Sequence, residues 1–417
     1  MTWAYRTELR RSPLRWVFPV LVAVVLLVLF GRSRSWIGVW SQASAAAQIP
    51  AFFLGSAMAG AASWAAAARR RSGVPTGFAA ARPSWRIEAA QFAATLTYGL
   101  AAYGIGVLTA AAVTAPRGGP AFQWPGYVLL GALLITGCTA LGHLVGRATR
   151  SLLAVPVVCT LGCLAFLGLY GFVPQGTEPG IGLAVLSGYP SRTVAAWPLL
   201  ARAAAVLALA GLAVATGRRV RTDGHGPEWR GRRFGTAGGV LALTGAVALW
   251  ASAGPLLVQR PAPAHPLCTT GAPTICVWPE SRQYLPALQA MAGRAAALPA
   301  GRFQVPDRFL EEGLNGEPLD HGNGFYLREG ETWEVATSIA FQTVDATIPQ
   351  SCRGTGEAPW ELIAWLTARL AGGGRPASVH GGPSGVDQEA IGRLVAQPED
   401  VQLAWLDQHL PREGHCG

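Results

Sequence analysis

The chain has 417 residues, of which 51% are hydrophobic and only 13% are charged. About a quarter of the residues of a soluble protein are charged, so this composition indicates a membrane protein. Every basic residue is Arg and none is Lys. Because a nucleotide-binding P-loop requires a Lys, the chain is not itself a P-loop ATPase. The net charge is +10, and the excess of Arg lies before Val258. This distribution is explained by the orientation of a membrane protein, and it argues against nucleic acid as a partner.

Residues 1–15 are basic, and their apolar residues are spaced to lie along one side of an interfacial helix: Trp3, Tyr5, Leu9 and Leu14. Beyond them, seven apolar runs approach the roughly 20 residues that a helix needs to cross a bilayer. The runs cover residues 16–30, 49–67, 89–113, 127–145, 152–173, 194–216 and 237–258. The sequence therefore predicts a polytopic α-helical bundle of about seven transmembrane helices over residues 16–258.

Arg residues are dense in the N-terminal tail and in the connections 68–88, 146–151 and 217–236, and they are sparse in the other connections. Since cytoplasmic loops carry the excess of positive charge, we expect the N-terminus in the cytoplasm. With seven crossings, the residues after Val258 are expected on the extracytoplasmic side of a multi-pass protein of the cell membrane.

The predicted spans contain few polar groups. No Asp or Glu lies in the middle of a span, which makes an ion-coupled transporter improbable. Arg202 is the one charge in mid-span; it either binds an anionic lipid or substrate or, as we favour, extends along its helix to the outer interface. His143 is interpreted as a hydrogen-bonded packing residue, and the spacing of Gly142 and Gly146 is typical of close helix packing.

The connection after the second span is the most suggestive of the basic loops. It carries an Arg cluster, two prolines and an amphipathic lead-in to the next span. Such a segment either docks on a cytoplasmic partner or is an ordinary positively charged loop. Its charged residues are Arg69, Arg70, Arg71, Arg82, Arg86 and Glu88.

A Pro-rich linker, 259–266, precedes a domain over 267–417 that contains four cysteines. An even number of cysteines in an oxidising compartment indicates disulfides. Of the three possible pairings we favour Cys268 with Cys276 and Cys352 with Cys416. A zinc site that combines these cysteines with nearby histidines is the less favoured alternative, because no CxxC pair is present.

The sequence predicts an α+β fold for this extracytoplasmic domain. Strands are expected at 274–278, 325–328 and 333–344, and helices at 280–298, after Pro306, and at 358–371, 386–396 and 398–410.

Catalytic motifs such as HExxH and GxSxG are missing from the sequence, so neither an enzyme nor a cofactor is expected. A cluster of five polar residues follows the helix expected at Pro306. We interpret it as a solvated loop rather than as a cation site or an acid–base pair. Its members are Glu311, Glu312, Glu317, Asp320 and His321.

Three stretches carry a resemblance to a known family: TELRRSPLRW, RSRSWIGVWSQASAAAQIPAFFLG and CVWPESRQYLPAL. Together they resemble bacterial ABC-2-type permease-like proteins with a C-terminal extracytoplasmic domain of unknown function. The resemblance implies that residues 1–15 form an amphipathic elbow and that residues 69–88 form the loop that couples to a separate cytoplasmic P-loop ATPase. It also implies a dimer, either with a second copy or with another permease. The seventh span and the external domain are additions to the six-helix permease pattern.

Two functional hypotheses follow. The first is the membrane subunit of an ABC-type transporter, which lies in the lipid bilayer and works with a separate cytoplasmic P-loop ATPase. The second is a membrane-anchored extracytoplasmic sensor or binding protein. Transport requires that an ATPase binds through residues 69–88, whereas sensing requires that the C-terminal domain binds a ligand.

Overall fold

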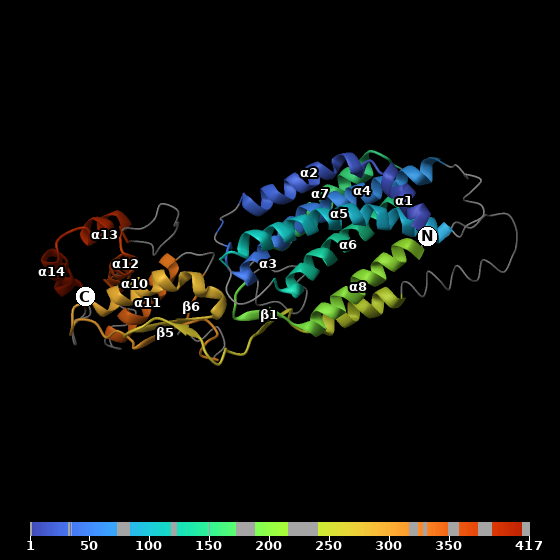
Figure 1. The fold of residues 1–417 in the computed structure, drawn as a ribbon. Helices are drawn as coiled ribbons and strands as arrows, with labels where there is room; N and C mark the ends of the chain where they lie inside the picture. The colour runs from blue at the N-terminus through green and yellow to red at the C-terminus, as the bar shows by residue number, and fades with distance from the viewer. Residues whose placement is uncertain are drawn as a thin grey trace, which may run out of the picture. The chain divides into compact units, whose positions relative to one another are not determined.

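The computed structural model describes residues 2–31, 34, 36–72, 84–117, 123–149, 151–171, 188–215, 241–316, 324–327, 332–348, 358–373 and 386–410. The chain divides into two compact units. Unit 1 comprises Met1–Pro116, Phe122–Gly188 and Arg192–Val258, and unit 2 comprises Arg117–Ala121, Tyr189–Ser191 and Gln259–Gly417. Figure 1 labels the elements of both units.

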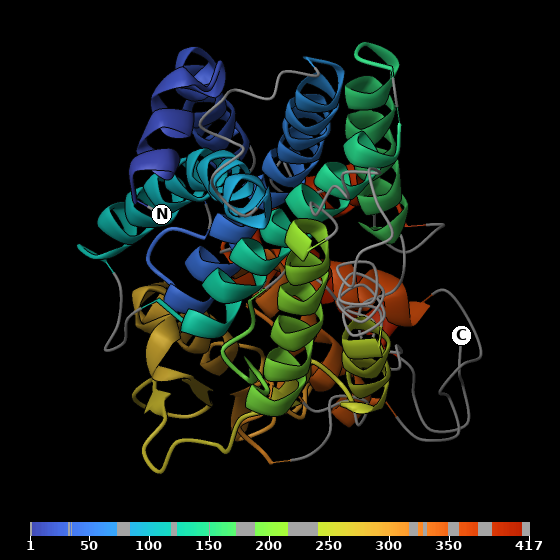
Figure 2. The ribbon, with the colours of Figure 1, turned by 90° about the vertical axis from the view of Figure 1, so that its right-hand side faces the viewer.

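Unit 1 is a bundle of apolar helices. Its elements are α1 (Thr2–Arg11), α2 (Leu14–Phe30), α3 (Trp40–Gln48), α4 (Pro50–Ser72), α5 (Ser84–Thr114), α6 (Pro125–Ala148), α7 (Ala154–Gly171), β1 (Arg192–Val194), α8 (Ala196–Ala215), a helix over Leu241–Ser252, and most of β2 (Leu257–Gln259). Helix α4 contacts α2, α5, α6 and α7, and α6 also contacts α8. Figure 2 shows α2 and α7 on either side of α4.

Four helical segments are long and apolar enough to cross a membrane: Trp40–Arg69, Trp85–Thr114, Pro125–Ala148 and Ala196–Ala215. A fifth crossing is added if α1 and α2 count as one span, which is bent by 71° because Pro13 interrupts the helix. Two shorter apolar helices, Ala154–Leu169 and Leu241–Ser252, lie within the predicted fifth and seventh runs. The described helices are therefore compatible with a membrane protein that has four or five crossings by length and composition.

The run 237–258 does not stay helical to its end. Its helix stops at Ser252, and Leu257–Gln259 is strand β2, which pairs with β1. Gly254 has φ +81°, a conformation that ends helices, and Pro255 follows it and cannot continue a helical hydrogen-bond ladder. Likewise Val194, expected at the start of the sixth run, belongs to β1.

Unit 2 combines a four-stranded sheet with helices. The sheet order is β3 (Leu267–Cys268), β4 (Thr274–Val277), β5 (Arg308–Glu311) and β6 (Gly324–Phe325), with β3 antiparallel to β4 and the other two pairs parallel. The remaining elements are η1 (Pro279–Tyr284), α10 (Leu285–Ala296), α11 (Thr332–Thr347), α12 (Ala358–Ala371), α13 (Gln388–Val395) and α14 (Glu399–His409). Residues Ile275, Phe309, Phe325, Ile339 and Trp365 lie in one buried core.

Two predicted elements of this unit are wrong. Residues 333–344, expected as a strand, lie in helix α11, whose buried side chains recur with the helical period of about 3.6 residues. The helix expected after Pro306 is instead β5, in which Phe309 and Glu311 point inward on alternate positions. In both segments, tertiary burial outweighs the local propensity on which the prediction was based.

The disulfide of the described residues joins Cys268 to Cys276, the pair that the sequence favours. These residues face each other in the antiparallel register of β3 and β4. Cys352 and Cys416 lie outside the described residues.

Candidate functional site

The residues predicted to contact an ATPase lie at two helix ends of unit 1. Arg69 is near the end of α4, and Arg86 and Glu88 are in the first two turns of α5. Arg70 and Arg71 also belong to α4, although their side chains, like the whole of Arg82, lie outside the described residues.

Arg69 connects three segments that are far apart in the sequence. Its Nη2 forms an ion pair with the carboxylate of Glu8 on α1, and its Nη1 lies 3.5 Å from the carbonyl oxygen of Ile87 on α5. Two tyrosines strengthen the contact between α1 and α5. Tyr98 donates a 2.7 Å hydrogen bond to the carbonyl oxygen of Leu9, and Tyr5 lies 2.9 Å from the hydroxyl of Thr97. The amphipathic helix α1 is therefore fixed to the end of α4 and to the middle of α5.

A second set of charges joins α5 to α6. Oε2 of Glu88 lies 3.3 Å from Nε2 of His143 and 3.3 Å from Nη1 of Arg147. His143 is buried and meets the ring of Phe92 edge-on. We call Glu8, Arg69, Glu88, His143 and Arg147 the elbow cluster.

The elbow cluster contains no Ser, Thr or Cys nucleophile, and its contacts are ion pairs that join helices. Sequence reasoning selected Arg69 and Glu88 but missed Glu8. A signal was present, because Glu8 and Glu88 are the first two acidic residues of the chain and stand among several Arg residues.

We expect the Glu8–Arg69 pair to contribute about 1 kcal/mol to the stability of the bundle, since both side chains are about one-third exposed. The measurement is a double-mutant cycle with Glu8→Gln, Arg69→Gln and the double variant, followed by thermal unfolding of the full chain in detergent. Purely additive single effects would show that the pair contributes nothing.

Arg202 is buried in α8. Its Nη1 donates a 2.9 Å hydrogen bond to the carbonyl oxygen of Pro198, and its guanidinium lies 5.7 Å from the ring centre of Trp250. The side chain thus reaches back one turn towards the N-terminal end of α8.

Unit 2 contains a group of buried acidic side chains, which corrects the interpretation of Glu311 and Glu312 as part of a solvated loop. Glu311 ends β5, and its carboxyl accepts hydrogen bonds from the backbone N–H of Trp278 (2.8 Å) and the hydroxyl of Ser281 (3.0 Å). Glu280 and Glu312 are also buried. Glu317, Asp320 and His321 lie outside the described residues.

Burial raises the pKa of Glu311 to about 8, although the hydrogen bonds from Trp278 and Ser281 lower it; the neighbouring carboxylates of Glu280 and Glu312 raise it further. Arg260 forms a 2.9 Å ion pair with Glu280 and lies over the ring of Trp278. Glu311 is therefore protonated near neutral pH. Within the described ranges, no three His, Cys, Asp or Glu side chains are arranged to hold a metal ion.

Comparison with known proteins addresses unit 2 alone. No curated protein and no solved structure matches the chain. Residues 275–416, about a third of the chain, match a family described as a domain of unknown function (DUF7224). This match begins within β4 and includes the buried acidic group, so the C-terminal part of the chain is similar to that domain family.

Proposed function

We propose that this chain is the permease-like membrane subunit of an ABC-type transporter and that it works with a separate cytoplasmic P-loop ATPase. The observation that carries the proposal is the Glu8–Arg69 ion pair, which joins α1 to the end of α4. The connection that follows α4 is the predicted docking loop. A partner that moves this loop would act on α1 through Arg69 and on α6 through Glu88.

The proposal includes a topology. Seven crossings, with the N-terminus in the cytoplasm, put unit 2 on the extracytoplasmic side. The distribution of Arg along the sequence and the Cys268–Cys276 disulfide support this orientation. A dimer, with a second copy or with another permease, would complete the translocation path.

The test is purification of the tagged full chain from its native cells in mild detergent, followed by mass spectrometry of the proteins recovered with it. We expect a P-loop ATPase in stoichiometric amount. The double charge reversal Arg70→Glu and Arg71→Glu should lower its recovery about tenfold, because like charges at an interface cost at least 1.4 kcal/mol. Arg69 is left intact so that α1 keeps its ion pair.

The matched control is Arg117→Glu, which reverses a charge beyond the other end of α5. It should leave the recovery of the ATPase unchanged. Retention of the ATPase by the Arg70→Glu, Arg71→Glu protein would overturn the docking assignment, and recovery of the wild-type chain without any ATPase would overturn transport.

The alternative function is an extracytoplasmic sensor or binding protein. It is favoured by one observation: unit 2 has a hydrophobic core of its own, separate from those of the bundle. A sensor would copurify with a kinase or regulator in place of an ATPase.

A further inference from the structure

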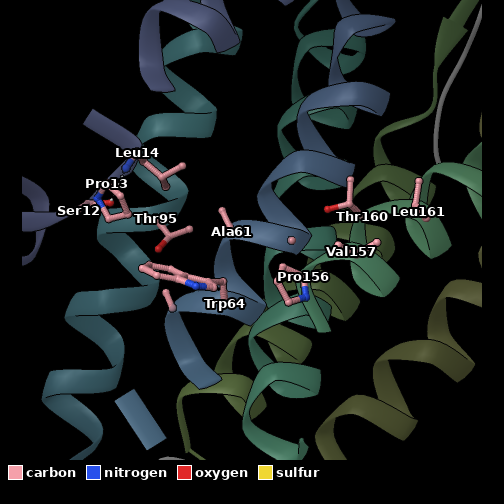
Figure 3. A pocket seen from close by; sticks show the side chains of 12 residues that line it. Ser12, Pro13, Leu14, Ala61, Trp64, Thr95, Pro156, Val157, Thr160 and Leu161 are labelled. Carbon is pink, nitrogen blue, oxygen red and sulfur yellow. Dashed lines mark hydrogen bonds between the residues drawn. The ribbon is translucent and has the colours of Figure 1, made fainter. Parts of the chain in front are cut away.

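Unit 1 contains a cavity of about 450 Å³ between helices, and the cavity is open to its surroundings. Its lining comes from the break between α1 and α2, from α4, from α5 and from α7. Figure 3 shows Ala61 and Trp64 of α4 in the middle, with Leu14 and Thr95 on one side and Val157 on the other. The volume falls within the range of sites that hold small molecules.

The two sides of the cavity differ in how their elements approach α4. A Cβ atom on Gly60 would lie 2.1 Å from Oγ1 of Thr160, so the glycine allows α7 to approach α4 closely on one side. On the other side, Pro13 bends the chain between α1 and α2 by 71°. The wall of the cavity formed by Leu14 is therefore set apart from the wall formed by α7.

The lining is suited to a hydrocarbon chain. Val157 and Leu161 are 56% and 57% exposed, and the indole of Trp64 is 40% exposed. Exposed apolar side chains on the helices of a membrane bundle face lipid, not water. An empty cavity would forfeit the dispersion contacts of its lining, which an acyl chain restores.

Two Arg residues are next to lining residues of the cavity in the sequence. Arg11 immediately precedes the lining residue Ser12, Arg15 immediately follows Leu14, and both Arg side chains are exposed. Glu8, the acidic residue of this stretch, is already paired with Arg69. Among the described residues of this stretch, an anionic group near Ser12 and Leu14 therefore has two Arg residues as neighbours in the sequence, while the carboxylate of Glu8 is engaged by Arg69.

We propose that this cavity binds one acyl chain of an anionic phospholipid whose phosphate lies against Arg11 and Arg15. Cations near a membrane surface attract anionic headgroups with a free energy that corresponds to severalfold in affinity for each residue. The bound lipid would join the α1–α2 break to α4 and α7. The proposal does not depend on the presence of an ATPase.

The experiment uses the full chain in vesicles with a phosphatidylglycerol that carries a photoreactive diazirine in its acyl chain. We expect covalent adducts in the peptides of α4 and α7 that line the cavity, about tenfold more than with the same acyl chain on phosphatidylcholine. Ala61→Phe, which fills the cavity, should remove most of these adducts. Ala101→Phe, at an exposed position of α5, is the size-matched control and should not.

Arg11→Gln with Arg15→Gln should bring phosphatidylglycerol labelling down to the phosphatidylcholine level, whereas Arg6→Gln on the exposed side of α1 should not. Ala65→Phe, which fills the same cavity from the next turn of α4, replaces Ala61→Phe if the latter protein does not fold. Unchanged labelling in a folded cavity-filling variant would overturn the site. Equal labelling by both lipids would overturn the headgroup assignment.

Discussion

Replacement of Gly142 by Ala is expected to destabilise the bundle by about 3 kcal/mol, because it overpacks the contact between α4 and α6. A Cβ atom at this position would lie 2.0 Å from the carbonyl oxygen of Ala59. One turn later, a Cβ atom on Gly146 would lie 2.1 Å from the carbonyl oxygen of Ser63. Both obstacles are backbone atoms, so no side-chain rotation relieves the overlap and the two helices must separate.

The measurement is thermal unfolding of the full chain in detergent, together with the fraction recovered as a monodisperse species. The control is Gly211→Ala on α8, where an added Cβ atom meets nothing within 4 Å. Since Ala favours a helix over Gly by up to about 1 kcal/mol, the control should be neutral or slightly stabilised. If Gly142→Ala and Gly211→Ala unfold at the same temperature, the close approach of α4 and α6 is not what holds the bundle together.

The same glycines show what the sequence was able to predict. The apolar runs and the GxxxG spacing of Gly142 and Gly146 depend on residues close together in the chain, and the structure has helices there with their backbones in contact. Helix ends that Pro or Gly sets were missed, because the runs were bounded by counting apolar residues. Pro125 begins α6 two residues before the predicted run, and Gly254 and Pro255 follow the end of the helix Leu241–Ser252 inside the predicted run 237–258.

The elements that were predicted wrongly depend on contacts distant in sequence. The segment WEVATSIAFQTV is rich in β-branched and aromatic residues, yet it is helical because Val335, Ile339 and Val344 pack into a core formed by other elements. Glu311 and Glu312, at the end of β5, were likewise interpreted as part of a solvated loop, because the residues that bury them are distant in the sequence. Only the fold brings Trp278 and Ser281 to Glu311, and only the fold brings Glu8 to Arg69.

The stability of unit 2 is expected to fall as the pH rises from about 4.5 to about 8, and Glu311→Gln should abolish most of that fall. The pKa of Glu311 is about 8 in the folded chain, compared with an ordinary value of 4.5. Between these values the native state keeps a proton that the unfolded state releases, so stability decreases by about 1.4 kcal/mol for each pH unit. Below pH 4.5 both states are protonated and the stabilisation is fully present; above pH 8 it is lost.

The groups that face Glu311 include Glu280, Glu312 and Tyr284, and Arg260 is paired with Glu280. Glu311→Gln keeps an acceptor for the N–H of Trp278 and carries no charge at any pH. Hydrogen exchange of peptides that cover β4 and β5, corrected for the intrinsic pH dependence of exchange, measures the stability of unit 2 within the full chain. The control Glu389→Gln, at an exposed position of α13, should retain the wild-type slope. If the stability of the Glu311→Gln protein falls with pH in parallel with that of the wild type, Glu311 is already ionised in the folded chain. The buried glutamates of unit 2 would then be stabilised by Arg260 rather than by a proton that Glu311 retains.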